Sequence, residues 1–392
     1  MKSQNTRIKR LLILSISVTT LWGEDFSWYF ETTMLQNDHY LGSSISDNQQ
    51  SLGVDGGLNL YPSDQSRLSA SFSGEQVYPT TDYSRGTLYL AYDWRGETDG
   101  ISPWQHYGGV SIGLNRYAAA LSYNDFTNLT GYFRSKVNTS MTSFWEGRYL
   151  FNAKLFQELP EASNLQHWLD MKYHRSFPIR TAMIFNLGAG VQDFLPVTQS
   201  TTVGQGRRQV IVAALPDLPT NYMGTASLHI SQSVTSWLGG WYNMYYQRRL
   251  DENTTGVIVS ESETSPIMDD FRWSGIEHSA GLNFRLPWRL SLSVDGSLGA
   301  RLYNDVPVYE YDFTLGEYAM DTDGNYLISA AQRTIESQRL QVVLSKTFYP
   351  GSYDDMGSLD VWIQGQYLTL NGNDPLYQFS GNQIQTGITF NY

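Results

Sequence analysis

Residues 277–302 read EHSAGLNFRLPWRLSLSVDGSLGARL, two extended segments that meet at Pro287. After Pro287, apolar residues occupy every second position from Trp288 to Leu302, with polar, charged or glycine residues between them. Successive strand side chains point to opposite faces, so this pattern predicts one apolar and one polar face. The run is longer than an ordinary strand of about five or six residues. Such long two-faced strands are typical of a barrel with lipid outside and water inside.

The same alternation runs through most of the chain, beginning at Phe26. Short turns are expected at 177–179, 233–237, 286–288 and 349–357, and long loops at 196–220, 251–274 and 305–337. This rhythm is typical of barrels with short periplasmic turns and long external loops, and it predicts an antiparallel transmembrane β-barrel of about 16 strands. About 14 or 18 strands also fit, because the turns within 106–140 have several candidate positions.

The composition is compatible with this all-β interpretation. The chain has 392 residues, 41% of them hydrophobic, and no run of about 18 apolar residues that would cross a bilayer as a helix. The absence of cysteine excludes disulfides, thiolate catalysis and Cys-based zinc sites. We find no linker that divides the chain, so residues 24–392 are expected to form a single barrel domain.

Residues 1–23 have the pattern of a secretory signal peptide. Lys2, Arg7, Lys9 and Arg10 precede an apolar stretch at 11–21, and Gly23 supplies a small residue near the expected cleavage point. Removing this leader takes four of the 26 basic residues and none of the 38 acidic ones, which leaves 22 minus 38, or −16. A surface with this charge is a poor partner for nucleic acid.

The C-terminal residues 384–392 read IQTGITFNY, with Ile384, Ile388, Phe390 and Tyr392 on one face. This stretch resembles the C-terminal signal of bacterial outer-membrane β-barrel proteins, whose members often end in Phe where this chain ends in Tyr. The resemblance is to porin-like barrels in general, with no motif of a closer subfamily. It implies location in the outer membrane of a diderm bacterium, contact with lipid, and recognition of Ile388, Phe390 and Tyr392 by the barrel-insertion machinery.

Tryptophans near the expected strand ends agree with aromatic girdles at the two membrane surfaces. The residues expected there are Trp28, Trp94, Trp104, Trp145, Trp168, Trp237, Trp241, Trp273 and Trp288.

If the apolar face is outside, the charged positions of the other face line the lumen. The predicted lining residues are Arg67, Glu75, Asp93, Glu146, Arg148, Asp170, Lys172, Arg180, Glu277, Arg285, Arg289, Asp295, Arg301, Arg339 and Asp360. A barrel of this size can hold an aqueous channel, and charges on its wall would bias which solutes pass. The alternative is that these residues pair across strands and stabilise an occluded interior. The same residues can line the lumen and also pair across strands.

We expect no catalytic, cofactor or metal site. His229 and Ser231 are spaced as in outer-membrane phospholipases, yet they fall on the polar side rather than facing lipid. Asp321, Asp323 and Asn325 resemble the start of a calcium loop, although Gly324 and Gln332 depart from the EF-hand pattern. The adjacent carboxylates Asp269 and Asp270 are common in loops. These acidic stretches are therefore interpreted as solvated loops.

The leading hypothesis is a porin-like barrel that passes small polar or ionic solutes passively, with selectivity from lumen charges and an infolded loop. A second hypothesis is a non-conducting surface barrel whose long acidic loops bind a partner. An outer-membrane hydrolase is the weakest alternative. A homo-oligomer is compatible with each, although no residue in the sequence identifies a subunit contact.

Overall fold

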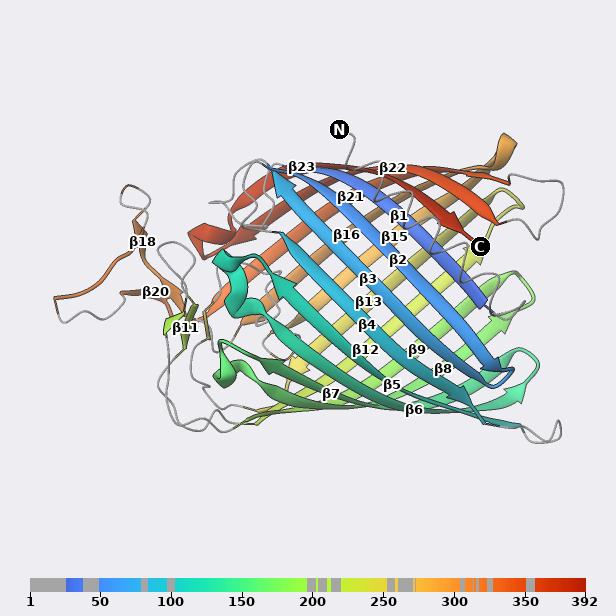
Figure 1. Ribbon diagram of the computed structural model, residues 1–392, viewed down its shortest axis with the longest axis horizontal. Coiled ribbons are helices and arrows are strands. Elements are labelled where there is room, and N and C mark those ends of the chain that lie inside the picture. Colours follow the sequence, from blue (N-terminus) through green and yellow to red (C-terminus); the bar gives the residue numbers. More distant parts are fainter. Residues whose placement is uncertain are drawn as a thin grey trace, which may run out of the picture.

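Sixteen antiparallel strands form one closed barrel (Figure 1) in this computed structural model. The structure describes residues 26–37, 49–78, 84–96, 103–195, 202–203, 210–212, 220–251, 258–259, 271, 273–303, 307–312, 314, 317–322, 327–349 and 357–392. The predicted signal peptide, residues 1–23, lies outside them. In ring order the strands are β1 (Phe26–Asn37), β2 (Gln49–Ser63), β3 (Ser66–Tyr78), β4 (Arg85–Arg95), β5 (Trp104–Tyr117), β6 (Phe126–Ser140), β7 (Ser143–Phe156), β8 (Asn164–Phe177), β9 (Thr181–Phe194), β12 (Asn221–Ser233), β13 (Leu238–Arg249), β15 (Ser274–Leu286), β16 (Leu290–Tyr303), β21 (Arg333–Phe348), β22 (Ser358–Gly372) and β23 (Phe379–Asn391).

The barrel closes where its first strand meets its last. β1 pairs with β2 on one side and with β23 on the other, in a register that sets Phe30 opposite Phe390. The backbones of Trp28 and Tyr392 exchange two hydrogen bonds, of 2.8 and 2.9 Å, and the Trp28 and Phe390 rings lie 5.2 Å apart. Closure leaves no barrel strand with an unpaired edge, which is what a strand in hydrocarbon requires.

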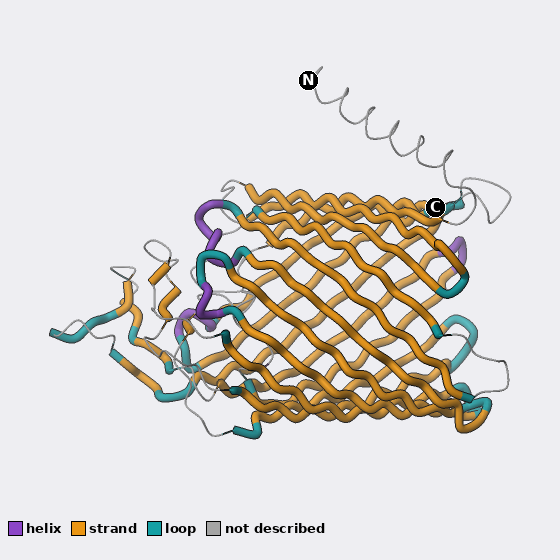
Figure 2. The backbone as a smooth tube through the Cα atoms, turned by 60° about the horizontal axis from the view of Figure 1, so that its bottom comes forward, coloured by secondary structure: helices purple, strands orange, loops and turns teal. Residues whose placement is uncertain are grey.

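The two ends of the barrel differ in how the strands are connected. At the end that holds the C-terminus, here called the turn end, tight turns join β2 to β3 and β6 to β7, and the helical turn η6 (Pro287–Arg289) joins β15 to β16. The opposite loop end carries η2 (Ala119–Asn124), η3 (Pro160–Ala162) and η8 (Pro375–Tyr377), the short helical segments of Figure 2. No helix among the described residues has the length and apolar character needed to span a membrane.

Small sheets extend the loop end beyond the barrel (Figure 1). One contains β10 (Thr202–Val203), β11 (Val210–Val212) and β14 (Ile258–Val259), so two predicted long loops pair with each other. The pairs β17 (Val308–Tyr309) with β20 (Ile328–Ala330), and β18 (Tyr311–Asp312) with β19 (Glu317–Tyr318), belong to the third predicted loop. That loop is shorter than the sequence predicted, because β21 begins at Arg333 rather than near residue 338.

The strand that follows Pro287 also begins later than predicted. Trp288 and Arg289 adopt positive φ angles of 61° and 60° in η6, and β16 starts at Leu290. Pro287 fixes its own φ and cannot donate to a ladder, so the chain turns over these residues instead of continuing the alternation. In the ambiguous region 106–140, residues 118–125 with η2 form the connection between β5 and β6.

Large apolar side chains lie on the outer face at alternate positions around the ring. Exposed examples are Leu68, Phe72, Leu88, Leu90, Val110, Ile112, Leu129, Leu169, Met171, Leu187, Leu282, Leu298, Leu340, Leu344, Ile363, Ile384 and Ile388. A soluble protein rarely exposes so continuous an apolar surface. Hydrocarbon is the solvent in which this exterior is stable.

Candidate functional site: the barrel interior

The closed barrel has an apolar exterior suited to hydrocarbon, so chemistry that acts on polar solutes must lie on its inner face. A cavity inside the barrel at the turn end is lined by Ser279, Asn283 and Arg285 of β15. The odd-numbered positions of that strand therefore point inward. Residues directly opposite across a strand pair share a face. The register therefore turns Ser297 of β16 and Arg339 of β21 inward as well.

Salt bridges between neighbouring strands cover much of this inner wall. Four pairs join directly opposed residues, and their N to O distances are 2.6 Å for Arg67–Asp93, 2.9 Å for Arg85–Glu75, 2.6 Å for Arg148–Asp170 and 3.0 Å for Lys172–Glu146. A fifth pair, Arg301–Glu277, is diagonal across its two strands, with a distance of 2.6 Å. The cationic partners are about a third to a half exposed, so each pair contributes only about 0.2–1 kcal/mol. The predicted cross-strand pairing is thus present, and it leaves these groups accessible from the lumen.

The other predicted lining residues fall into three environments. Arg180 and Arg285 contribute to the turn-end cavity, whereas Asp295 and Arg339 lie on the inner wall of β16 and β21. Asp360 accepts hydrogen bonds from Thr347 Oγ1, at 2.6 Å, and from Asn391 Nδ2, at 3.1 Å.

The placement of Arg289 on a lumen-facing strand is corrected by the structure. Arg289 lies in η6, with its guanidinium carbon 4.4 Å from the centroid of the Tyr349 ring. The positive φ at this residue breaks the period-two alternation on which its assignment to the inner face was based.

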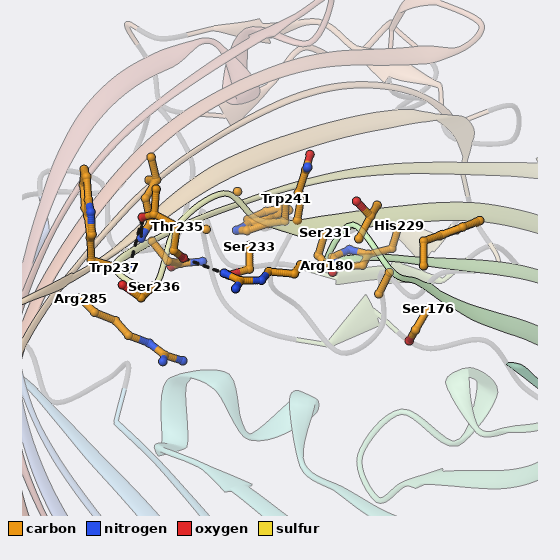
Figure 3. A pocket seen from close by; sticks show the side chains of 18 of the residues that line it. Ser176, Arg180, His229, Ser231, Ser233, Thr235, Ser236, Trp237, Trp241 and Arg285 are labelled. Atoms are coloured by element: carbon orange, nitrogen blue, oxygen red, sulfur yellow. Dashed lines mark hydrogen bonds between the residues drawn. The ribbon is translucent and has the colours of Figure 1, made fainter. Parts of the chain in front are cut away.

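The turn-end cavity has a volume of about 840 Å³ and is formed by β8, β9, β12, β13 and β15 with their connecting turns (Figure 3). Its lining residues are Ser176, Phe177, Arg180, Thr181, Ala182, His229, Ser231, Gln232, Ser233, Thr235, Ser236, Trp237, Leu238, Gly239, Gly240, Trp241, Asn243, Ser279, Asn283 and Arg285. Half of these residues carry hydroxyl or amide side chains, two are arginines, and none is acidic.

An aromatic surface forms part of the cavity wall. The rings of His229 and Trp241 lie with centroids 6.2 Å apart and planes inclined by 22°. Gly281, on the neighbouring strand, has no side chain, and a Cβ there would lie 2.6 Å from Nε1 of Trp241. The indole can therefore lie flat over the backbone of β15, which leaves one ring face toward the lumen.

Arg180 is held in an unusual backbone conformation. Its φ is 59°, in the left-handed region, which costs a non-glycine residue roughly 1–2 kcal/mol. Its carbonyl accepts a hydrogen bond of 3.1 Å from the backbone N–H of Ser233, which ties the β8–β9 turn to the end of β12. In Figure 3 the Arg180 side chain extends into the cavity, and Arg285 enters it from β15.

Charges of opposite sign gather on opposite walls. Glu31, Asp55 and Asp360, on β1, β2 and β22, form one sector, and β8 and β9 lie across the ring from β1. Around β6 to β9 and on β15, toward the turn end, the positive residues are Arg134, Lys136, Lys172, Arg180 and Arg285. Glu146, which bonds Lys172 and lies 3.8 Å from Arg134, offsets only part of this charge. The lumen therefore has a transverse asymmetry of charge.

Two hydrophobic clusters lie at the loop end. The first joins η2 and η3 to β7 through Leu121, Tyr123, Phe156, Leu159 and Ala162, and the second packs Trp273, Tyr303, Ile335, Leu370 and Tyr377. Tyr303 and Ile335 have the same parity as the inward residues Arg301 and Arg339 on their strands, so the second cluster lies on the inner side. The sequence analysis did not identify these clusters, although aromatics at polar-face positions near the strand ends were a signal for them.

The tryptophan prediction is partly wrong. Trp241 lines the cavity, Trp168 shares the inner face of β8 with Asp170, and Trp273 is buried at the loop end. Trp94, Trp104, Trp145, Trp237 and Trp288 are exposed.

The weaker site candidates also have definite positions. His229 and Ser231 line the cavity, on the polar side where the sequence placed them. Asp269, Asp270, Asp323 and Asn325 lie outside the described residues.

Comparison with known proteins finds similar solved structures but no similar sequence. No protein-family profile matches the chain, and no curated protein matches it in sequence. OprB of Pseudomonas putida is similar at 9% identity and a TM-score of 0.48, over 94% of each chain. OccAB1 of Acinetobacter baumannii has 9% identity and a TM-score of 0.47, over 94% of this chain and 96% of that one. A bacterial polysaccharide outer membrane secretin has 8% identity and a TM-score of 0.45, over 93% and 98%. These are likenesses of fold alone.

Proposed function

We propose that the protein is a porin-like channel for passive diffusion of small polar or ionic solutes across the outer membrane. The observation that carries this proposal is an inner wall of partly exposed ion pairs, together with a cavity of about 840 Å³ at the turn end that is lined by hydroxyl, amide and arginine side chains as well as apolar ones. A barrel that served only as a rigid support could fill its interior with packed side chains, as small barrels do. With its turn end toward the periplasm, the cavity would lie at the inner mouth of the channel.

The predicted pore-lining residues, apart from Arg289, are proposed to set the selectivity. Opposed positive and negative sectors produce a field across the lumen, and this field orients and sorts charged or dipolar solutes. The hydrophobic clusters at the loop end take the constricting role that the sequence analysis gave to an infolded long loop.

Planar-bilayer recording tests the proposal. Purified protein should give stable single-channel steps, and Arg285→Glu should shift the reversal potential in a salt gradient toward cations at low ionic strength, where screening is weakest. Lys346→Glu is the matched control. The register sets Lys346 opposite Leu290, on the outer face of β21, so this substitution makes the same change from positive to negative charge outside the lumen. Folded protein without channel steps, or equal shifts for both variants, would contradict the proposal.

The second candidate function is a non-conducting surface barrel. It is favoured by the small sheet β10–β11–β14, which ties two loops together beyond the barrel, and by the hydrophobic clusters packed at the same end. Absence of conductance from barrels whose strand content is intact would favour this alternative.

We also propose that residues 1–23 are removed on export and that residues 24–392 form the mature barrel. Ile388, Phe390 and Tyr392 are proposed to be the signal read by the insertion machinery. The exposure of Ile388 on the last strand and of Tyr392 directly after it supports this, because a recognition signal must be accessible. N-terminal sequencing of the exported protein tests the cleavage site.

A further inference from the structure

The turn-end cavity differs from the rest of the inner wall in its charge pairing. Arg67, Arg85, Arg148 and Arg301 each contact a carboxylate on a neighbouring strand. In contrast, Arg180 and Arg285 reach no acidic side chain in the part of the chain that the structure describes, and the cavity lining holds no Asp or Glu. Two guanidinium groups thus supply donors that no carboxylate among the described residues neutralises.

The position of Arg180 is maintained at an energetic cost. A left-handed backbone at a non-glycine residue persists where the surrounding structure holds it, and such strain is concentrated at ligand sites. The β8–β9 turn is held by the hydrogen bond from Ser233 to the Arg180 carbonyl. As Figure 3 shows, this turn directs the side chain along the cavity toward the wall that carries Arg285.

The remaining lining is suited to a hydroxylated molecule rather than to a bare ion. Ser231, Ser279 and Thr181 offer hydroxyl groups, and Asn243 and Asn283 offer amides, which can both donate and accept. The flat surface of His229 and Trp241 presents ring faces on which the C–H face of a sugar ring can pack. The volume of about 840 Å³ falls in the range of small-molecule sites, about 300–1,000 Å³.

From these features we infer that the cavity binds a small anionic sugar derivative, a carboxylate or phosphate ester of a monosaccharide. The anionic group would lie between Arg180 and Arg285, because a planar guanidinium matches the oxygens of either group in bidentate geometry. The hydroxyls would meet the serine and amide side chains, and the ring would lie against Trp241. This inference rests on the proposed function, since it names the solute class of the same lumen, yet binding can be measured without any ion current.

Isothermal titration of the detergent-solubilised full-length barrel tests the site. The probes are glucuronate, glucose 6-phosphate and neutral glucose at low ionic strength. We expect saturable binding of at least one anionic sugar, about tenfold or more tighter than glucose, because hydrogen bonds to charged groups give discrimination of this size. The stronger of the two anionic probes distinguishes a carboxylate site from a phosphate site.

Matched variants locate the binding. Arg180→Gln and Arg285→Gln should each weaken anionic sugar binding by about tenfold or more, and Arg285→Lys should restore part of the affinity. Arg339→Gln is the control, since Arg339 is on the inner wall but outside the cavity. Circular dichroism confirms that each variant retains the barrel.

Three results would overturn the inference: equal affinity for glucose and the anionic sugars, wild-type affinity in both cavity variants, or no saturable binding of either anionic sugar. A barrel that binds the sugar but gives no channel steps would refute the proposed diffusion function and leave the site standing. A conducting barrel without saturable binding would refute the site alone.

Discussion

Two arginine substitutions, one on each face of a single strand, test which face of the barrel wall contacts lipid. Leu340 lies at the middle of β21 (Arg333–Phe348) and is 52% exposed on the outer face. At about 3.3 Å rise per residue and a tilt near 40°, it lies roughly 18 Å along the barrel axis from either strand end. This is the centre of an apolar band about 25 Å tall. Leu340→Arg should therefore cost about 2–4 kcal/mol of folding free energy.

The neighbouring position supplies the control. Gln341 points inward, and the register sets it opposite Asp295. Gln341→Arg puts the same side chain into the lumen beside a carboxylate, so its effect should stay within about 1 kcal/mol of wild type.

Urea titration of both variants in lipid vesicles measures the difference, with tryptophan fluorescence reporting the folded fraction. A larger loss for Gln341→Arg than for Leu340→Arg would refute the assignment of the apolar face to lipid. Equal losses would show that the two faces do not differ in solvent.

Two further predictions concern the loop end and the closing seam. Asp374 and Arg333 form a salt bridge of 2.8 Å, and their side chains are only 5% and 2% exposed. Asp374→Asn should therefore lower the free energy of unfolding by about 3 kcal/mol in urea titration, whereas Asp93→Asn, whose partner Arg67 is half exposed, should lower it by about 1 kcal/mol or less. Equal losses in the two variants would contradict this reasoning. Phe390→Ala removes the ring contact with Trp28, and it should lower stability by about 3 kcal/mol and reduce the yield of barrel inserted in cells, while an unchanged yield would argue against a role as assembly signal.

Two features of the interior could have been predicted more fully from the sequence. Trp241 occupies a polar-face position on its strand, so its parity already separated it from girdle tryptophans such as Trp94. The aromatics at the inner strand ends, such as Tyr303 and Tyr117, gave a similar signal for packing at the loop end. In both cases proximity to a strand end was a weaker guide than the face on which the side chain lies.

By itself the sequence determined the kind of barrel, because period-two alternation over long strands sorts apolar groups to one face and charged groups to the other whatever the pairing. It therefore predicted that Arg67 and Asp93 lie on the polar face. Only the tertiary structure decided that these two stand opposite each other while Arg180 and Arg285 have no carboxylate partner among the described residues. Pairing depends on the register between strands, and register is set by turn geometry and ring closure, which bring together residues that no local pattern relates.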